Sequence, residues 1–424
     1  MDLNIQSCRN LTSIEIKGGV SSLPQLTIRD CEELSSLPAL PPSLKELEMR
    51  GCPKVQSNSI SLQSLQKLYL QRCDGLSGPL SVWASLMDLN IESCRNLTSI
   101  EIKGGVSSLQ KLRIRYCEEL SSLPALPPSL KELLISDCPK VASFGVQSNS
   151  ISLQSFSDLP TFTSLRELTI RNCEGLESWV SGLQFPLSLE GLTIEGFPNL
   201  EILPSLDNLT SLRYLGIVNW RKLKYLPTGL RWPPRLKQLS IGGLWEELDS
   251  FPDFQVGSLM HLTSLTLYGW PKLKSLPQQI QHLTSLTSLS LYDLGGVETL
   301  PECLGSLTSL TSLEVRGFHL LETLPECLGS LTSLTSLDVR GFHLLETLPE
   351  CLGSLTSLTF LSIGWCENLM NLPIVQAMQR LTKLHTLRII ECHPLLKQRC
   401  SRDSGTDWPK ISHIPNIYGN CLNS

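Results

Sequence analysis

The chain has 424 residues and a formal net charge of −5, and charged residues make up 18% of it. This acidic balance, with no long basic run, argues against nucleic acid as the main partner. No stretch of about 18 apolar residues and no signal-peptide pattern occurs, so we expect neither a membrane-spanning helix nor secretion.

A short leucine pattern recurs along the sequence, roughly L-x-x-L-x-[LI]-x-x-[C or apolar]-x-x-L-x-x-L-P. A fixed period in the twenties predicts a leucine-rich-repeat solenoid. About 17 repeats are expected, and 384 residues over 16 intervals give a mean period of 24. The central strand leucines are Leu3, Leu26, Leu47, Leu68, Leu89, Leu112, Leu133, Leu168, Leu192, Leu215, Leu239, Leu265, Leu289, Leu313, Leu337, Leu361 and Leu387.

Each repeat predicts one short strand followed by turns. Leu26 and Ile28 are two residues apart, so a strand points both to one side while Thr27 and Arg29 point away. One coil cannot bury its leucines alone, but stacked coils share a core and pair their strands in parallel. The outer segments are broken by proline, serine and glycine, which favours turns and short 3-10 pieces. We therefore expect a strand-dominated α/β-type solenoid with a curved parallel sheet on its concave face.

The N-terminal part of the sequence contains a tandem copy. Residues 1–55 recur as 87–141 with nine differences, and eight of these lie at polar or variable positions in or beside the predicted strands. The ninth, Met49/Ile135, exchanges one apolar residue for another. A fixed framework with one changing face indicates a recognition surface, although drift of a solvated face or gene conversion is an alternative. The eight pairs are Gln6/Glu92, Pro24/Gln110, Gln25/Lys111, Thr27/Arg113, Asp30/Tyr116, Glu48/Leu134, Arg50/Ser136 and Gly51/Asp137.

The predicted boundaries are a solenoid over residues 1–395 and a capping tail over residues 396–424. Met1 corresponds to Met87, which lies inside a repeat, so we expect a truncated first repeat and hence a fragment of a longer protein or gene product. An irregular insertion is expected near residues 141–163, where the strand spacing jumps to 35.

Most of the fifteen cysteines occupy one repeated slot, three residues after the second strand apolar residue. Phe, Trp or Leu takes this slot in other repeats, which indicates a buried position where a free thiol packs well. No CxxC pair occurs, so a zinc site is not expected. Unpaired thiols favour a reducing compartment. The slot cysteines are Cys8, Cys31, Cys52, Cys73, Cys94, Cys117, Cys138, Cys173, Cys366 and Cys392, and a second ladder is formed by Cys303, Cys327 and Cys351.

The candidate site is a protein-binding concave face, because Tyr, Trp and Arg are the usual energetic anchors of interfaces. No nucleophile, base and orienting group share a spacing that suggests catalysis, so no enzyme activity or cofactor is expected. His319 and His343 are expected to lie one above the other, which is weak evidence for metal. The proposed contact residues are Gln25, Thr27, Arg29, Asp30, Glu48, Arg50, Tyr69, Lys111, Arg113, Arg115, Tyr116, Leu134, Asp137, Arg171, Tyr214, Tyr268, Tyr292 and Trp365.

The Leu-Pro coils at Leu300, Leu324, Leu348 and Leu372, with the tail from Asp407-Trp-Pro-Lys to Pro415, resemble a known family. They are similar to the repeat region of plant intracellular nucleotide-binding leucine-rich-repeat disease resistance proteins of the coiled-coil, non-TIR branch. The resemblance implies cytoplasmic recognition of a pathogen effector or guarded host protein in the defence response. It also implies contact with a nucleotide-binding switch domain, which the repeats would hold in an autoinhibited state. No phosphate loop exists here, so nucleotide binding does not carry over.

Other functions remain open. A non-functional receptor remnant or a general intracellular repeat scaffold would carry the same pattern. An extracellular receptor ectodomain is a further alternative, but its coils usually read Gly-x-Ile-Pro and its ends carry paired cysteines.

Overall fold

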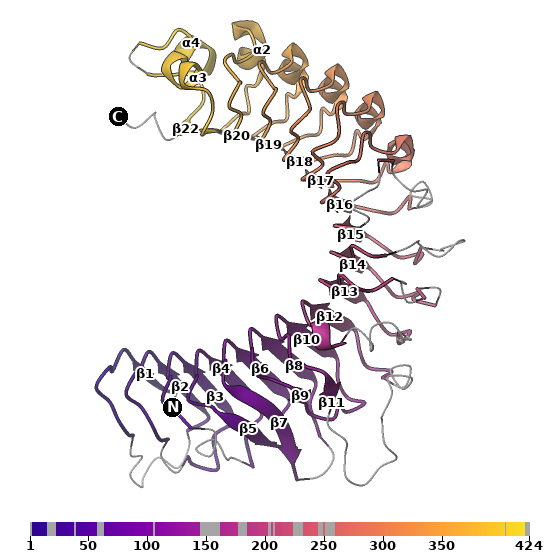
Figure 1. Cartoon of the computed structure of the whole chain (residues 1–424). Coiled ribbons are helices and arrows are strands. Elements are labelled where there is room, and N and C mark those ends of the chain that lie inside the picture. The colour runs from indigo at the N-terminus through magenta and orange to yellow at the C-terminus, as the bar shows by residue number, and fades with distance from the viewer. Residues whose placement is uncertain are drawn as a thin grey trace. The chain divides into compact units, whose positions relative to one another are not determined.

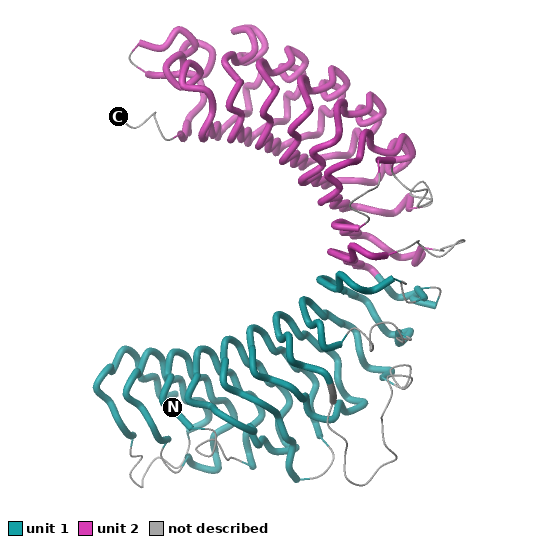
Figure 2. Tube along the Cα trace, in the orientation of Figure 1, with its two compact units in different colours: residues 1–212 teal, residues 213–424 magenta. Residues whose placement is uncertain are grey.

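The computed structural model describes residues 2–14, 23–37, 40–56, 63–104, 107–144, 162–176, 185–201, 205–206, 208–223, 232–244, 249–250, 259–402 and 404–419. These residues form two compact units, residues 1–212 and residues 213–424 (Figure 2). Each unit consists of stacked coils, and each coil contributes one strand to a parallel sheet (Figure 1).

The sheet of unit 1 follows the chain order of its coils. Each strand pairs in parallel with the next, and the central leucines are aligned, as in Leu26 opposite Leu47 and Leu47 opposite Leu68. The strands are β1 (Leu3–Gln6), β2 (Gln25–Arg29), β3 (Glu46–Arg50), β4 (Lys67–Gln71), β6 (Asp88–Glu92), β8 (Lys111–Arg115), β10 (Glu132–Ser136), β12 (Glu167–Arg171) and β13 (Gly191–Glu195).

The outer side of unit 1 carries a second, smaller parallel sheet, where the sequence predicted only turns and 3-10 pieces. Alternation explains it, because Leu80 and Val82 of one strand are buried while their neighbours are not, and Leu97 and Ile100 anchor the next. Its strands are β5 (Gly78–Trp83), β7 (Leu97–Lys103), β9 (Ser122–Leu123) and β11 (Ser143–Phe144), and a short 3-10 helix, η3 (Glu174–Leu176), follows β12.

Unit 2 repeats the parallel pattern with a different outer side. Its strands are β14 (Tyr214–Val218), β15 (Gln238–Gly242), β16 (Ser264–Tyr268), β17 (Ser288–Tyr292), β18 (Ser312–Arg316), β19 (Ser336–Arg340), β20 (Phe360–Gly364), β21 (Thr386–Ile390) and β22 (Asn416–Tyr418). Its helices are η5 (Gln278–His282), η6 (Glu302–Ser306), η7 (Glu326–Ser330), η8 (Glu350–Ser354), α2 (Val375–Arg380), α3 (Pro394–Arg399) and α4 (Trp408–Ile411).

The 3-10 helices of unit 2 confirm the expected short outer pieces. Each of η5 to η8 begins directly after a proline, whose fixed φ suits the entry to a helical turn. One leucine or isoleucine of each helix, such as Leu304 or Ile280, is buried. Proline therefore starts the turn and one apolar side chain holds it against the core.

The predicted repeat positions agree with the structure. All 17 central leucines lie in strands of the main parallel sheet of unit 1 or unit 2, and none lies in the outer sheet. The repeated slot is buried from Cys31 onward, and Trp220 and Phe342 fill it in unit 2. Cys8 is an exception, because it is exposed and β1 pairs with β2 alone within the described residues. Cys303 and the two other cysteines of the second ladder are half-buried.

The C-terminal segment closes the stack of unit 2. Strand β22, which the sequence did not predict, pairs with β21, and Ile411 and Ile414 are buried against the coils. Asp407, 1% exposed, lies 3.4 Å from Arg399 and 3.3 Å from Lys410. The predicted boundary at residue 396 stays a prediction, and residues 145–161 of the expected insertion lie outside the described residues. Among the described helices, none has the length and apolar character to cross a membrane.

Candidate protein-binding face

The outward side chains of each strand, at its first, third and fifth positions, form what we call the concave face. Parallel register places equivalent positions side by side, about 4.8 Å apart. In unit 1 the middle row runs through Thr27, Glu48, Tyr69, Asn90 and Arg113 on consecutive strands. Neighbours in such a row contact each other directly, so the register decides which side chains interact.

A charge cluster occupies the first part of this face. Glu48 accepts hydrogen bonds from Nε and Nη2 of Arg29 at 3.1 and 2.8 Å, and Nε of Arg50 lies 2.7 Å from the same carboxylate. The Arg50 guanidinium stacks over the Tyr69 ring, 4.6 Å from its centroid. Burial raises the pKa of the Tyr69 hydroxyl, which donates to Glu92 at 3.4 Å. Aromatic and arginine side chains are therefore held in fixed positions on the surface.

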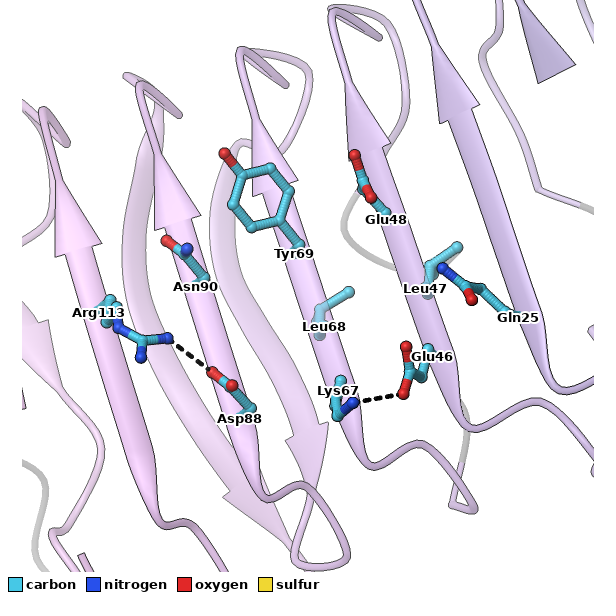
Figure 3. Close-up of a pocket in the computed structure, with 10 residues that line it drawn as sticks. All are labelled: Gln25, Glu46, Leu47, Glu48, Lys67, Leu68, Tyr69, Asp88, Asn90 and Arg113. Atoms are coloured by element: carbon cyan, nitrogen blue, oxygen red, sulfur yellow. Dashed lines mark hydrogen bonds and ion pairs between the residues drawn. The ribbon is translucent and has the colours of Figure 1, made fainter. Parts of the chain in front are cut away.

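A depression of about 260 Å³ lies beside this cluster, across strands β2 to β8 (Figure 3). Lys67 is bound to Glu46 at 2.5 Å, and this hydrogen bond raises the pKa of the lysine. Arg113 reaches Asp88 at 3.3 Å on the opposite side. The depression is lined by Gln25, Glu46, Leu47, Glu48, Lys67, Leu68, Tyr69, Asp88, Asn90 and Arg113.

The side-chain oxygen of Asn90 is an unsatisfied polar atom in this lining. It is buried and accepts no hydrogen bond within the described part of the chain. An unsatisfied buried acceptor is unfavourable, so a donor from a bound partner would be stabilised here. The depression thus has the size and polarity for one side chain of a partner, with charged groups around it.

Arg113 stands where the first copy has Thr27. It forms ion pairs with carboxylates on both neighbouring strands. It donates from Nε and Nη2 to Glu132 at 2.5 and 2.7 Å, besides its contact with Asp88. The hydrogen bond to Glu132 raises the pKa of Arg113. This arginine therefore belongs to a saturated ion-pair network.

The residue after each strand of the concave face, from β1 to β21, adopts a left-handed backbone conformation. Asp30 has φ 52° and Asp137 has φ 55°, and short polar residues or glycine tolerate this region. Tyr116 (φ 55°) and Trp365 (φ 50°) occupy the same position with bulky rings that are 51% and 48% exposed. An exposed ring held in an unfavourable backbone conformation is a feature of binding sites.

The structure places every predicted contact residue on or directly beside the concave face of its unit. Those in unit 1 are brought together over strands β2 to β12, whereas Tyr214, Tyr268, Tyr292 and Trp365 belong to unit 2. The nine differences between the copies also fall as expected, because each lies within a strand or next to one. Thr27, at 7% exposed, and Met49, at 0%, are the buried ones among the first-copy residues.

Unit 2 has a cluster that the sequence did not reveal. Arg316 lies 2.7 Å from Asp338 and stacks over Tyr292 at 5.3 Å. Arg340 lies 2.6 Å from the same carboxylate and stacks over Trp365 at 5.6 Å. The two near-identical segments L-E-V-R-G-F and L-D-V-R-G-F were the available signal, since register places their arginines side by side.

The expected histidine stack is present. The rings of His319 and His343 lie 4.8 Å apart. In the described ranges, no group of three or more His, Cys, Asp or Glu residues is arranged to hold a metal ion. The pair therefore contributes a ring contact between consecutive coils.

Comparison with known proteins agrees with this architecture. A model of a leucine-rich-repeat region matches residues 236–422. A solved leucine-rich-repeat protein of Leptospira interrogans has 23% identity, covers 89% of this chain and 90% of its own, and superposes with a TM-score of 0.61. The chain is a leucine-rich-repeat solenoid.

Other matches to this solenoid are more distant. The leucine-rich effector protein YopM from Yersinia pestis has 21% identity over 88% of this chain and 85% of its own, with a TM-score of 0.49. A search of curated protein sequences finds no match. Leucine-rich-repeat solenoids are typically non-enzymatic scaffolds for protein–protein interaction, and the clustered arginine and tyrosine side chains of this face are consistent with that role.

Proposed function

We propose that the solenoid recognises a protein partner through the concave face of unit 1, as part of a plant immune receptor acting in the cytoplasm. The observation that carries the proposal is the divergence of the two copies: eight of the nine substitutions lie on or beside this face, and the ninth, Met49/Ile135, keeps an apolar residue in the core. Drift of a solvated surface would also change the outer segments, yet residues 31–45 and 117–131 are identical.

The resemblance to plant disease resistance proteins suggests what the partner is and which domain the solenoid regulates. The partner is then a pathogen effector or a guarded host protein, and the solenoid restrains a nucleotide-binding domain that this chain does not contain. Free thiols throughout the described part of the chain are consistent with a reducing compartment. A general scaffold or a receptor remnant would keep the fold without selective change on the face.

A two-hybrid screen with the full chain as bait provides the partner, and variants then locate the binding site. Replacing Thr27, Asp30, Glu48 and Arg50 by their second-copy counterparts Arg, Tyr, Leu and Ser is expected to weaken binding at least about 10-fold, because interface anchors typically contribute more than 1 kcal/mol each. Unchanged affinity in titration calorimetry contradicts the proposed face.

The matched control removes an ion pair away from the concave face. Lys54 and Glu33 are exposed and 2.6 Å apart, and such pairs contribute little to stability. The variant Lys54→Ala/Glu33→Ala is expected to bind like the wild type. Equal loss in both variants indicates a general effect on folding.

The proposed compartment has its own test. Asn10 and Asn208 are exposed within Asn-Leu-Thr sequons, so passage through the secretory pathway would expose them to glycosylation. A fluorescent fusion of the full chain in leaf cells is expected to distribute in the cytoplasm and to show no mobility shift after endoglycosidase treatment. A shift contradicts the cytoplasmic assignment.

A further inference from the structure

One arginine, Arg29 in the first copy and Arg115 in the second, has different ion-pair partners in the two copies of the duplicated block. In the first copy, Arg29 and Arg50 share the carboxylate of Glu48. The equivalent positions, 86 residues later, are Arg115, Ser136 and Leu134 in that order. The arginine is retained while its carboxylate has become a leucine, so Arg115 has lost the acceptor that its counterpart uses.

The nearest acidic side chains toward β10 are engaged elsewhere. Glu132 is held by Arg113 through two hydrogen bonds. Asp137 accepts from the Ser136 hydroxyl at 2.5 Å and from Asn172 Nδ2 at 2.8 Å. Neither the retained Glu132 nor the new Asp137 therefore contacts the retained arginine.

The carboxylate on the side of Arg115 that faces β6 does not contact this arginine either. Glu92 is opposite Arg115 in the register, but its Oε2 accepts from the Tyr69 hydroxyl. Within the part of the chain that the structure describes, the side chain of Arg115 forms no ion pair, hydrogen bond or ring contact. An arginine without an acceptor on a folded surface is available to a carboxylate from outside.

Two acidic residues near this arginine are replaced by apolar or aromatic ones, while the acidic residues gained at Glu92 and Asp137 have the other partners described above. Tyr116 and Leu134 stand where the first copy has Asp30 and Glu48. Tyr116 is 51% exposed, and Leu134 points outward from β10 with part of its surface accessible. Lys111, exposed at the start of β8, adds a second cation. The patch therefore combines positive charge with an aromatic and an aliphatic surface.

We propose that this open patch of Lys111, Arg115, Tyr116 and Leu134 binds an acidic segment of a protein partner, an inference that rests on the proposed recognition function. A partner carboxylate accepts hydrogen bonds from the Arg115 guanidinium, as Glu48 does from Arg29. An apolar side chain beside that carboxylate packs on Leu134 and Tyr116. The first copy, whose arginines are neutralised internally, does not offer this site.

The site can be closed by restoring the first-copy arrangement. The double variant Leu134→Glu/Ser136→Arg in the full chain is expected to bind Arg115 internally and to exclude an external carboxylate. Arg115→Gln removes the cation while keeping a side chain of similar reach. The control is Lys140→Ala/Glu119→Ala, which removes an exposed ion pair of the second copy outside the concave face. Circular dichroism and thermal melts check that each variant is folded.

The probe is a displayed random-peptide library selected on the immobilised full chain at about 0.15 M salt, where long-range charge effects are screened beyond roughly 8 Å. The selected peptides are expected to be enriched in Asp or Glu beside an apolar residue. Their affinity is expected to fall at least about 10-fold with Leu134→Glu/Ser136→Arg and with Arg115→Gln, and to stay unchanged with the control.

Four outcomes overturn the inference. Peptides without acidic enrichment, acidic peptides that bind the closed variant as well as the wild type, or the recovery of no peptide each contradict it. Peptides that lose affinity with the first-copy variant Glu48→Leu/Arg50→Ser but not with Arg115→Gln overturn this patch while leaving the concave face as the recognition surface. The two proposals therefore fail separately.

Discussion

The two units fill the same core slot with different side chains. In unit 1 the slot holds cysteines from Cys31 to Cys173, whereas in unit 2 it holds residues such as Trp220, Phe318 and Phe342 before cysteine returns near the C-terminal end. Consecutive strands are often 21 residues apart in unit 1 and 24 apart in unit 2. A longer coil encloses more volume, which a ring fills at native density. Coil length and slot size therefore match in many coils, with exceptions such as Cys366, which fills the slot of a 26-residue coil, and Phe197, which fills that of a 23-residue coil.

Alkaline pH is expected to separate the cysteine-lined coils of unit 1 most strongly from the coils of β14 to β16 in unit 2, which contain no cysteine. Burial raises the pKa of the Cys52 and Cys173 thiols to about 12, well above the value of 9.0 for an exposed thiol. Below pH 9 both states keep these protons, but between pH 9 and 12 the unfolded chain loses them first, so stability falls as pH rises. Each thiol contributes up to about 1.4 kcal/mol per pH unit in that window.

Hydrogen exchange followed by mass spectrometry checks this order. Peptides from β2 to β12 are expected to lose protection at a lower pH than peptides from β14 to β16, whose coils contain no cysteine. Replacing Cys52 and Cys173 by alanine moves the loss to higher pH. Simultaneous loss in these two groups of peptides, or no effect of the replacements, contradicts the thiol explanation.

Removing a ring from unit 2 is expected to have the next largest effect. Phe318 and Phe342 are buried and stack with centroids 5.6 Å apart. Phe318→Ala leaves a cavity that costs about 3–5 kcal/mol in a core. Urea unfolding measures the change, and Phe318→Leu is the control with a smaller cavity. A loss of unfolding free energy below about 1 kcal/mol contradicts this prediction. It would mean that the coils collapse into the cavity, which typical core substitutions do not allow.

The converse substitution tests whether a short coil admits a ring. Cys73 is buried in a 21-residue coil, and Cys73→Phe is expected to destabilise by about 1–3 kcal/mol through overpacking. Cys73→Ala, which adds no volume, separates overpacking from loss of the thiol. A fully stable Cys73→Phe variant contradicts the link between coil length and slot size.

The smallest effect concerns the strained position after β8. Tyr116 has φ 55°, a conformation that costs a residue with a Cβ about 1 kcal/mol. Tyr116→Gly is expected to stabilise unit 1 by up to about that amount while weakening partner binding. Thermal melts and calorimetry measure the two effects. Destabilisation shows that the ring packs on the fold and is not reserved for a partner.

Much of the fold followed from the sequence because leucine spacing fixes both the strand and its buried side. Leu26 and Ile28 behave as predicted, and so does the slot of Cys31. The outer sheet of unit 1 was not predicted, because the buried residues of β7, Leu97 and Ile100, are three apart and do not show the period of two typical of a strand. The pairing of β22 depends on contacts far apart in the sequence and leaves no local pattern.

The candidate face was predicted at the level of residues but not of contacts. Outward positions follow from the period of two, so Arg29, Glu48 and Arg115 were identified. Which carboxylate each arginine takes depends on register across strands. The contrast between the paired Arg29 and the unpaired Arg115 appeared only when these side chains were placed.

The central claim, that the concave face of unit 1 carries recognition, is tested most directly by hydroxyl-radical footprinting of the full chain with and without the partner from the screen. Tyr116 is 51% exposed and Tyr418, in unit 2, is 49% exposed, so they form a matched pair. Partner binding is expected to reduce oxidation of Tyr116 and leave Tyr418 unchanged. Full oxidation of Tyr116 in the complex, or protection of Tyr418 alone, contradicts the account.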